Sequence, residues 1–392
     1  MAKKTQGVFV PFKRAEQEKA LCFAVSLPDR KNDPERSLNE LCELAESANA
    51  IVVGKMLQRR PRLDAATYLG KGKLQELKDM AEQLEADLLI CDDELSAAQL
   101  RNIEDFCRIK VVDRSLLILD IFARRAKTAE GKLQVELAQQ AYLLPRLQAQ
   151  VGFHSRTGGG IGTRGPGETI MDRDRRHIRN RINTLRKQLK QMEKRRELAH
   201  AKRKRDHSVF TVAVVGYTNA GKSTLVNTLC KSDLLTEDKV FATLDPATRK
   251  YYVPELQEQV LMTDTVGFVR KLPHHLVEAF KSTLEEAVYA DLILHVVDAS
   301  DPYAIDGIAV CEDLLRDLGA LEIPRICVLN KIDKVSEVDQ GLFLHFKGSR
   351  DNDVLEISAT TGQGLQELHQ KIVAELLKLG ATEMIIAGET PE

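Results

Sequence analysis

The sequence lacks tryptophan, has few aromatic residues and contains no long apolar run in its 392 residues. A transmembrane helix needs about 18–20 consecutive apolar residues, and every apolar segment here is shorter. Residues 1–6 are mostly polar and lack the apolar segment of a secretory signal peptide. We therefore expect a cytoplasmic protein with no membrane span.

Paired cysteines are also missing, because the seven cysteines are scattered and form no C-x-x-C motif. Zinc sites and disulfide frameworks usually show cysteines at short, regular spacing. The sequence therefore predicts neither of them. We interpret the cysteines as small buried side chains in a protein of a reducing compartment.

The net charge is only −1, yet basic residues are concentrated between residues 173 and 205. The rest of the chain is correspondingly acidic. A local cluster of one sign says more about binding partners than the total charge does. The basic segment is either an ordinary solvated helix face or a surface that binds RNA phosphates through counterion release. Its charge density favours RNA.

Apolar strands alternate with amphipathic helices in two parts of the chain. In residues 21–127 this pattern predicts a small α/β domain with a largely parallel sheet. In residues 208–378 it predicts a doubly wound α/β domain. The strands are expected at residues 21–27, 50–53, 87–91, 109–112, 210–215, 260–262, 292–297, 325–329 and 354–357. We expect residues 1–20 to be a flexible N-terminus and residues 379–392 a short tail.

The middle region, residues 128–207, is expected to form a coiled-coil-like helical hairpin. Its second helix carries apolar residues at steps of four and three, which predicts a seam against the first helix. These residues are Ile178, Ile182, Leu185, Leu189 and Met192. A glycine-rich segment at residues 152–167 joins the two helices. It could enter a narrow RNA crevice or serve as a linker, and both interpretations stay open.

One octapeptide fits the pattern G-x-x-x-x-G-K-[ST], directly after a predicted strand and at the start of a helix. It reads Gly216-Tyr217-Thr218-Asn219-Ala220-Gly221-Lys222-Ser223. In such a P-loop, backbone N–H groups and the helix N-terminus surround the phosphates of a nucleotide. We expect Lys222 to act catalytically on the β- and γ-phosphates and the Ser223 hydroxyl to bind Mg²⁺.

Three further segments follow predicted strands in the order found in Ras-like GTPases. Asp264-Thr265-Val266-Gly267 is expected to hold Mg²⁺ through water and to contact the γ-phosphate through the Gly267 N–H. Asn330-Lys331-Ile332-Asp333 is expected to bind guanine, because the Asp333 carboxylate can accept two hydrogen bonds that adenine cannot donate. Ser358-Ala359-Thr360 can offer a backbone N–H to the guanine carbonyl. Together these segments predict a GTP and GDP site.

A candidate switch segment lies between the P-loop helix and Asp264. It reads Phe241-Ala242-Thr243-Leu244-Asp245. We choose Thr243 as the second Mg²⁺ ligand and as a catalytic residue, with Thr248 as the alternative. Either threonine would order its loop only while the γ-phosphate is present.

The glutamine that orients the attacking water in Ras-like proteins is missing, because Phe268 occupies its position. Intrinsic hydrolysis should therefore be slow and should depend on help. Asn219 could hold K⁺, whose charge would act like that of an arginine finger, or it could simply cap the loop. The other source of help would be a large partner that completes the site.

Four segments together closely resemble the HflX family of GTPases. They are Tyr68-Leu69-Gly70-Lys71-Gly72-Lys73, the glycine-rich residues 158–168, the P-loop and residues 241–246. The resemblance extends from about residue 20 to residue 378. The glycine-rich segment is more specific to this family than the P-loop, which many families share.

This resemblance implies a chain that binds the large (50S) ribosomal subunit and its 23S rRNA, with stimulation of GTP hydrolysis by that subunit. It implies the splitting of stalled or idle 70S ribosomes under stress such as heat shock, by a monomer partly associated with ribosomes. Relatives are also said to bind ATP through the N-terminal domain, for which residues 70–73 are the only candidate here. Large-subunit assembly and ATP-dependent rRNA remodelling remain alternative functions.

Overall fold

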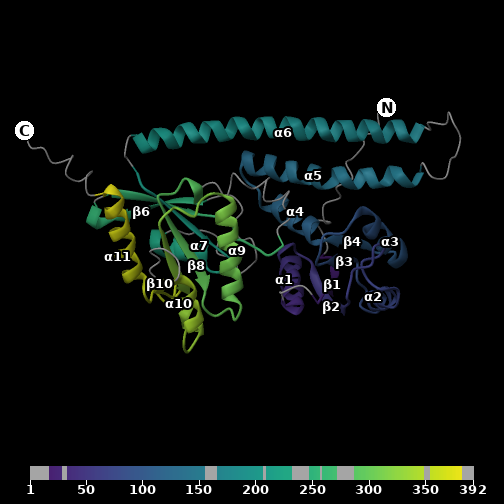
Figure 1. The fold of residues 1–392 in the computed structure, drawn as a ribbon, viewed down its shortest axis with the longest axis horizontal. Helices are drawn as coiled ribbons and strands as arrows, with labels where there is room; N and C mark the ends of the chain where they lie inside the picture. The colour runs from purple at the N-terminus through teal and green to yellow at the C-terminus, as the bar shows by residue number, and fades with distance from the viewer. Residues whose placement is uncertain are drawn as a thin grey trace, which may run out of the picture. The chain divides into compact units, whose positions relative to one another are not determined.

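The computed structural model describes residues 17–28, 33–154, 166–205, 209–231, 247–256, 258–271, 287–347 and 354–381. The chain divides into two compact units. One comprises Met1–Arg124 with Val135–Leu185, and the other Arg125–Gln134 with Arg186–Glu392. Each unit contains one β-sheet (Figure 1). No helix in the described residues is both long and apolar enough to cross a membrane.

The first unit contains a four-stranded sheet in the order β2-β1-β3-β4, and all its strand pairs are parallel. Helices connect the strands, as parallel pairing requires. The elements are β1 (Lys19–Ser26), α1 (Pro34–Ser47), β2 (Ile51–Arg59), α2 (Lys71–Gln83), β3 (Leu88–Cys91), α3 (Ala97–Cys107), β4 (Lys110–Asp113) and α4 (Arg114–Arg125).

Alternation along β1 explains the layers of this unit. Leu21, Phe23 and Val25 point to one face of the sheet, where they pack with apolar residues of α2 and α3. Helix α3 begins at a capping box, in which the Ser96 side chain accepts from the Gln99 N–H and the Gln99 side chain accepts from the Ser96 N–H. These two bonds fix the start of the helix at Ser96.

The helices α5 (Ala129–His154) and α6 (Pro166–Arg205) run side by side (Figure 1). Ion pairs join them within each unit, from Arg181 to Glu136 at 2.6 Å and from Arg196 to Glu130 at 2.7 Å. Within the predicted seam, Ile182 and Leu185 are buried. The hairpin prediction is therefore confirmed, and its first helix, α5, continues through Pro145.

The second unit contains a six-stranded sheet in the order β10-β9-β8-β5-β7-β6, parallel except for the pair β6 and β7. Its elements are β5 (Thr211–Gly216), α7 (Lys222–Cys230), β6 (Ala247–Val253), η2 (Pro254–Leu256), β7 (Glu258–Asp264), β8 (Leu292–Asp298), α9 (Ala304–Asp317), β9 (Arg325–Asn330), η3 (Ile332–Lys334), α10 (Gln340–Lys347), β10 (Val354–Glu356), α11 (Leu365–Leu376) and η4 (Leu377–Ala381). This is the expected α/β fold of a P-loop domain.

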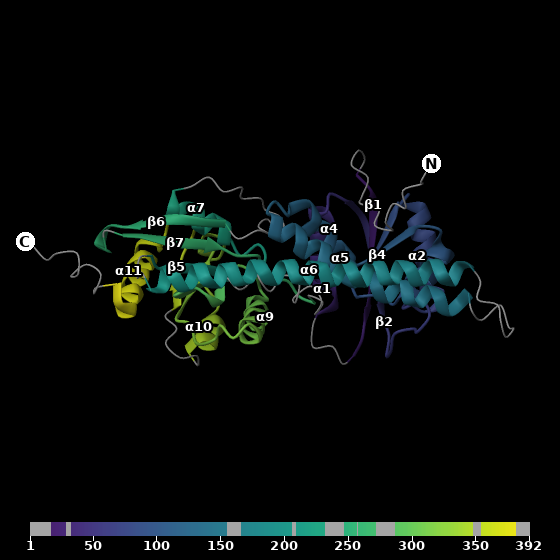
Figure 2. The ribbon, with the colours of Figure 1, turned by 90° about the horizontal axis from the view of Figure 1, so that it is seen from above.

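Helices cover both faces of this sheet. Apolar residues of α7 and α11 join one buried cluster with the central strands, whereas residues of α9 and α10 join another. Figure 2 shows α7 on one side of the strands and α9 with α10 on the other. The carboxyl ends of β5, β7 and β9 therefore meet at one edge, where the motif residues follow them.

Two strands differ from the sequence prediction. The strand expected at residues 50–53 extends over Ile51–Arg59, where it pairs with the whole of β1. The strand β6 was not expected, because exposed polar and charged residues interrupt its apolar pattern. It forms the edge of the sheet, where one side of a strand faces solvent and needs no apolar run.

Candidate nucleotide-binding site

The P-loop follows β5 and depends on two glycines. A Cβ atom at Gly216 would lie 2.2 Å from the carbonyl oxygen of Val296 on the neighbouring strand. Gly221 has a φ of +89°, and a Cβ atom there would lie 2.3 Å from the amide nitrogen of Asn330. Neither position can accept a side chain without moving backbone or a guanine-motif residue, so the sequence must have glycine at both.

The buried Lys222 ammonium lies inside the loop that precedes it. Nζ donates to the carbonyl oxygens of Gly216 at 3.1 Å and Tyr217 at 2.8 Å. Burial lowers the pKa of Lys222, and the nearby Asp264 carboxylate opposes this change. A positive charge is therefore fixed at the N-terminus of α7, where backbone N–H groups also attract anions.

Two oxygen groups meet beside this lysine. The Ser223 hydroxyl donates to the Asp264 carboxylate at 2.6 Å, although the two residues belong to α7 and β7. Asp264 is fully buried. A hydroxyl and a carboxylate are hard oxygen donors of the kind that Mg²⁺ prefers. The structure therefore places the predicted ligand Ser223 beside Asp264, the residue expected to hold Mg²⁺ through water.

The segment after β7 is tied to the P-loop by its backbone. The Phe268 N–H donates to the Gly216 carbonyl at 3.1 Å, and the Thr218 N–H donates to the Phe268 carbonyl at 2.8 Å. The Thr265 hydroxyl bonds the Val214 carbonyl at 2.8 Å. A Cβ atom at Gly267 would lie 3.0 Å from Lys222 Nζ. Gly267 and Lys222 are therefore neighbours, as the sequence predicts.

The side chain of Phe268 is only 1% exposed. Its backbone forms a parallel bridge with Tyr217, and its ring is part of the interior. A buried phenyl ring has no group that could orient a water molecule. The structure thus explains how phenylalanine fits at this position, and it assigns the ring a packing role.

Asn330 connects the P-loop with the third predicted segment of the guanine site. Its side-chain amide donates to the Ala220 carbonyl at 2.9 Å, and its amide oxygen accepts from the Ala359 N–H at 3.0 Å. The Ala359 N–H is therefore already engaged by protein. Thr360 lies beside it, with its hydroxyl 3.0 Å from that of Ser358.

The remaining residues of the guanine motif face outward or make a local ion pair. Lys331 has a φ of +66° and pairs with Asp298 at 2.7 Å. Ile332 is half-buried, whereas Asp333 is exposed. An exposed carboxylate at the carboxyl end of β9 is accessible to a base that lies across this edge of the sheet.

Asn219 is exposed and has a φ of +62°. Asparagine tolerates this left-handed conformation better than most residues do. Its presence in the loop is therefore explained by backbone geometry alone. The alternative role, binding of K⁺, remains a prediction.

Part of the candidate site lies outside the described residues. This applies to Phe241, Ala242, Thr243, Leu244 and Asp245, so the choice of Thr243 remains a prediction. The alternative, Thr248, lies in β6 opposite Thr263, with the two hydroxyl oxygens 3.1 Å apart. Its hydroxyl is thus engaged within the sheet.

Sequence reasoning did not find two charged residues beside the site, Arg270 and Asp306. The Arg270 guanidinium donates to Asp306 at 2.6 Å, and the Arg270 N–H donates to the Tyr217 hydroxyl at 2.9 Å. The partners are 36 residues apart along the chain. No local motif marks such a pair, so the sequence contained no signal for it.

Models of three protein families match the chain in succession. A model described as "GTP-binding GTPase N-terminal" matches residues 35–123, and one described as "GTP-binding GTPase Middle Region" matches residues 125–203. A third, described as "50S ribosome-binding GTPase", matches residues 211–331. The third match contains the P-loop and the segment around Asp264.

Similar proteins span most of the chain. "GTPase HflX" of Caldanaerobacter subterraneus is 52% identical over 93% of this chain and 82% of its own length, and that of Escherichia coli is 43% identical over 86% and 79%. A GTP-binding protein of Sulfolobus solfataricus, solved with GDP, is 26% identical, with a TM-score of 0.51 over 93% of this chain and all of its own. The "SsGBP and GDP complex" has a TM-score of 0.54 at 26% identity, over 93% of this chain and 99% of its own. The predicted resemblance is confirmed: the chain belongs to the HflX family of GTPases and is a GTP-hydrolysing enzyme.

Proposed function

We propose that GTP binds at the carboxyl ends of β5, β7 and β9 and is hydrolysed there. The P-loop backbone and Lys222 would hold the phosphates, and the Gly267 N–H would contact the γ-phosphate. Asp333 would select guanine through the two hydrogen bonds that it can accept. The observation that carries this proposal is the convergence of Lys222, Ser223, Asp264 and Gly267, from two segments, at the N-terminus of α7.

The residues present fit a Mg²⁺ ion. Ser223 and Asp264 supply adjacent oxygen donors, and Thr243 is the proposed further ligand. When bound, the ion would neutralise charge on the β- and γ-phosphates. The chain's own contribution is to fix these donors and Lys222 before GTP arrives, which avoids reorganisation during the reaction.

Hydrolysis by the isolated chain should be slow. Phe268 is buried, so this position offers no group to orient water. The help would come from K⁺ at Asn219 or from a macromolecular partner that completes the site. Either would supply the charge or the water contact that Ras-like proteins obtain from glutamine and an arginine finger.

The proposed partner is the large ribosomal subunit with its 23S rRNA. Helix α6 supports this, because Lys187, Lys190 and Lys194 recur at helical spacing and are all exposed. Such a cationic row attracts RNA phosphates. The description of the third family model, "50S ribosome-binding GTPase", agrees with this choice.

The biological role that we propose is the splitting of stalled or idle 70S ribosomes during stress such as heat shock. The protein would act as a cytoplasmic monomer whose GTP-bound form has the higher affinity for the subunit. Hydrolysis to GDP would then release it. This role rests on the family and on the cationic helix. The alternative role is large-subunit assembly.

The first experiment measures steady-state GTP hydrolysis with and without purified 50S subunits, in K⁺ buffer and again in Na⁺ buffer. We expect a strong stimulation by the subunit in either buffer, because the partner replaces the missing glutamine. A further increase in K⁺ alone would assign the ion to Asn219. Absence of stimulation in both buffers would contradict the proposed partner.

A second experiment tests the RNA-binding face of α6. Arg181 is unsuitable, because its guanidinium makes two 2.6 Å bonds to Glu136 and holds the hairpin. The double variant Lys187→Gln and Lys194→Gln should weaken 50S binding. The slope of its salt dependence should fall by the amount expected for the loss of about two phosphate contacts. The matched control, Arg316→Gln with Lys378→Gln, removes two charges from exposed positions of the GTPase domain. Equal binding by both variants would exclude this face.

A further inference from the structure

Three segments of the GTPase domain meet beside Gly267. The P-loop contributes Tyr217, the segment after β7 contributes Arg270, and the first turn of α9 contributes Asp306. The Tyr217 hydroxyl accepts the Arg270 N–H at 2.9 Å. The Arg270 guanidinium donates to the Asp306 carboxylate at 2.6 Å. Arg270 thus bonds the P-loop through its backbone N–H and α9 through its side chain.

The burial of this pair is asymmetric. The side chain of Arg270 is 5% exposed, whereas that of Asp306 is 52% exposed. Removing a guanidinium from water is costly unless a carboxylate and good hydrogen bonds compensate. Arg270 is therefore held in one place by Asp306, in contrast to an exposed arginine that samples many rotamers.

Tyr217 completes the connection. Its ring packs over Gly307 of α9, where a Cβ atom would lie 3.6 Å from the ring. Its backbone bridges Phe268. The segment of Gly267 to Arg270 is thus fastened by backbone bonds at Phe268 and by two bonds at Arg270, which leaves Gly267 little freedom relative to Lys222.

We infer that Arg270 and Asp306 are a positioning pair, which fixes the Gly267 N–H for the γ-phosphate by anchoring its segment to α9 and to Tyr217. This inference rests on the proposed role of Gly267 in GTP binding. In this role both side chains act through the backbone of the Gly267 segment, and neither is assigned a contact with the nucleotide. The pair gives this segment a rigidity that suits a site without a water-orienting glutamine.

This role predicts an effect that depends on the γ-phosphate. GDP lacks that group, so loosening Gly267 should leave GDP affinity unchanged. Affinity for a non-hydrolysable GTP analogue and the single-turnover rate should both fall. A pair that served stability alone would lower the thermal midpoint and change both nucleotide affinities together.

The experiment compares Arg270→Gln and Asp306→Asn with the wild type. Each variant should lose about tenfold in affinity for the GTP analogue, equivalent to about 1.4 kcal/mol, and a similar factor in single-turnover rate. GDP affinity should stay within about twofold. The exchanged double variant, Arg270→Asp with Asp306→Arg, should recover part of the loss, as expected for a direct pair.

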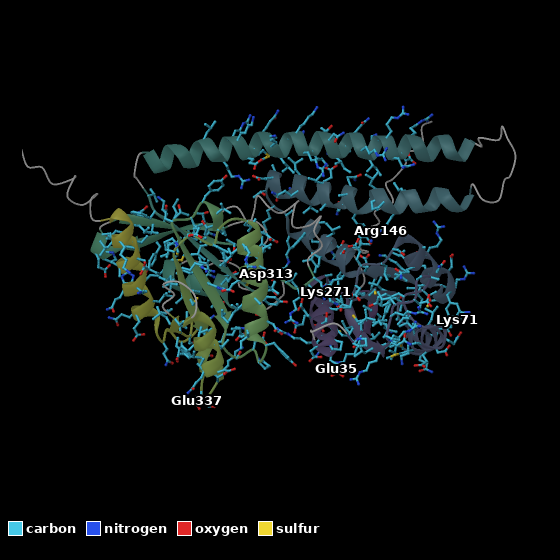
Figure 3. The ribbon with its side chains drawn as sticks, in the orientation of Figure 1. Glu35, Lys71, Arg146, Lys271, Asp313 and Glu337 are labelled. Carbon is cyan, nitrogen blue, oxygen red and sulfur yellow. The ribbon has the colours of Figure 1, made fainter. Side chains whose placement is uncertain are left out.

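Arg316→Gln is the matched control, because Arg316 pairs with Asp313 at 2.5 Å on the exposed side of the same helix; Figure 3 labels Asp313. It should behave as wild type. Equal losses of GDP and analogue affinity, or no loss in either variant, would overturn the positioning role. If Arg270→Gln fails to fold, Asp306→Asn still tests the positioning role, because the Asp306 side chain is half-exposed.

Lys222→Ala is measured in the same assays, so that the two proposals can fail separately. If Lys222→Ala still hydrolyses GTP normally, the proposed site is wrong and the positioning pair falls with it. If Lys222→Ala is inactive while both pair variants behave as wild type, only the positioning role is contradicted.

Discussion

The two sheets of this protein are parallel, apart from the β6–β7 pair of the second, but they use their carboxyl edges differently. At the edge of the GTPase sheet, β5 leads into a glycine loop, β7 ends in Asp264 and β9 ends in Asn330. At the edge of the N-terminal sheet, β3 leads to Asp92 and β4 ends in Asp113, and both carboxylates bind arginines. One edge presents a glycine loop, where we propose that GTP binds, and the other is occupied by carboxylates paired with arginines.

The N-terminal edge contains two buried ion-pair networks. Arg114 bonds Asp92 at 2.8 Å and also bonds Glu40. Arg146 of α5, labelled in Figure 3, bonds Asp113 at 2.9 Å and stacks on Tyr142. Burial raises the pKa of Asp113, while Arg146 opposes that rise. These charges join the sheet to α1 and α5.

Tyr68 lies at the point where the strand order reverses, between β1 and β3. Its hydroxyl donates to Asp93 at 2.6 Å and accepts from the Val25 N–H at 3.0 Å. In an open α/β sheet this is the usual place for a ligand. Both sheets have such a point, so the composition of the loops, and not sheet topology, distinguishes the two edges.

The largest expected effect concerns the ligand-binding edge. Lys222→Ala should reduce GTP turnover by about 10³-fold or more, because the charge on the β- and γ-phosphates is lost. The free energy of unfolding without nucleotide should not fall, since burial already disfavours the charged amine. Steady-state turnover and denaturant unfolding measure the two quantities. Lys378→Ala, at an exposed position, is the control.

At the N-terminal edge we expect a substitution to lower stability and to leave GTP turnover unchanged. Arg114→Met removes the partner of two buried carboxylates, which should cost about 3–5 kcal/mol of stability. GTP turnover by the folded fraction should remain near the wild-type value. Denaturant unfolding followed beside turnover would check this.

Arg124→Met removes an arginine of the same helix whose side chain is 36% exposed, so it should cost much less. An equal cost for both variants would show that the Arg114 network contributes nothing beyond an ordinary surface pair. A loss of GTP turnover in Arg114→Met would contradict the purely structural role of the N-terminal edge, because both edges would then contribute to hydrolysis.

Local signals predicted much of this structure. The P-loop and the seam of α6 follow from residues close together in sequence. The carboxyl-end placement of Asp264 and Asn330 followed from strand order alone. The family resemblance also rested on local motifs, the P-loop among them.

Long-range pairings were not predictable in this way. Arg114 with Glu40, Arg146 with Asp113, and Arg270 with Asp306 join residues separated by tens of positions. Each looks like an ordinary charged residue in its own helix or loop. Helix α4 was missed because Asp113, whose carboxylate accepts from the Leu116 N–H and so caps the helix, is also the last residue of β4.

The smallest predicted effect tests whether a buried carboxylate in the N-terminal unit lowers the free energy of unfolding. Burial raises the pKa of Asp120 from 3.8 to about 6, although Arg124 opposes this. Between these pH values the folded protein holds a proton that the unfolded chain releases, so the free energy of unfolding falls as pH rises.

Asp120→Asn should therefore be more stable than wild type above pH 6, by about 1–2 kcal/mol after loss of the Arg124 pair. This advantage should shrink as pH falls from about 6 to about 4, because the wild-type carboxyl then becomes neutral as well. Denaturant unfolding of both proteins across this range would measure it. An advantage that is constant with pH would show that the substitution acts through packing and not through the charge of Asp120. A variant less stable than wild type at pH 8 would mean that the Arg124 pair outweighs the burial of the carboxylate, and that this charge stabilises the unit.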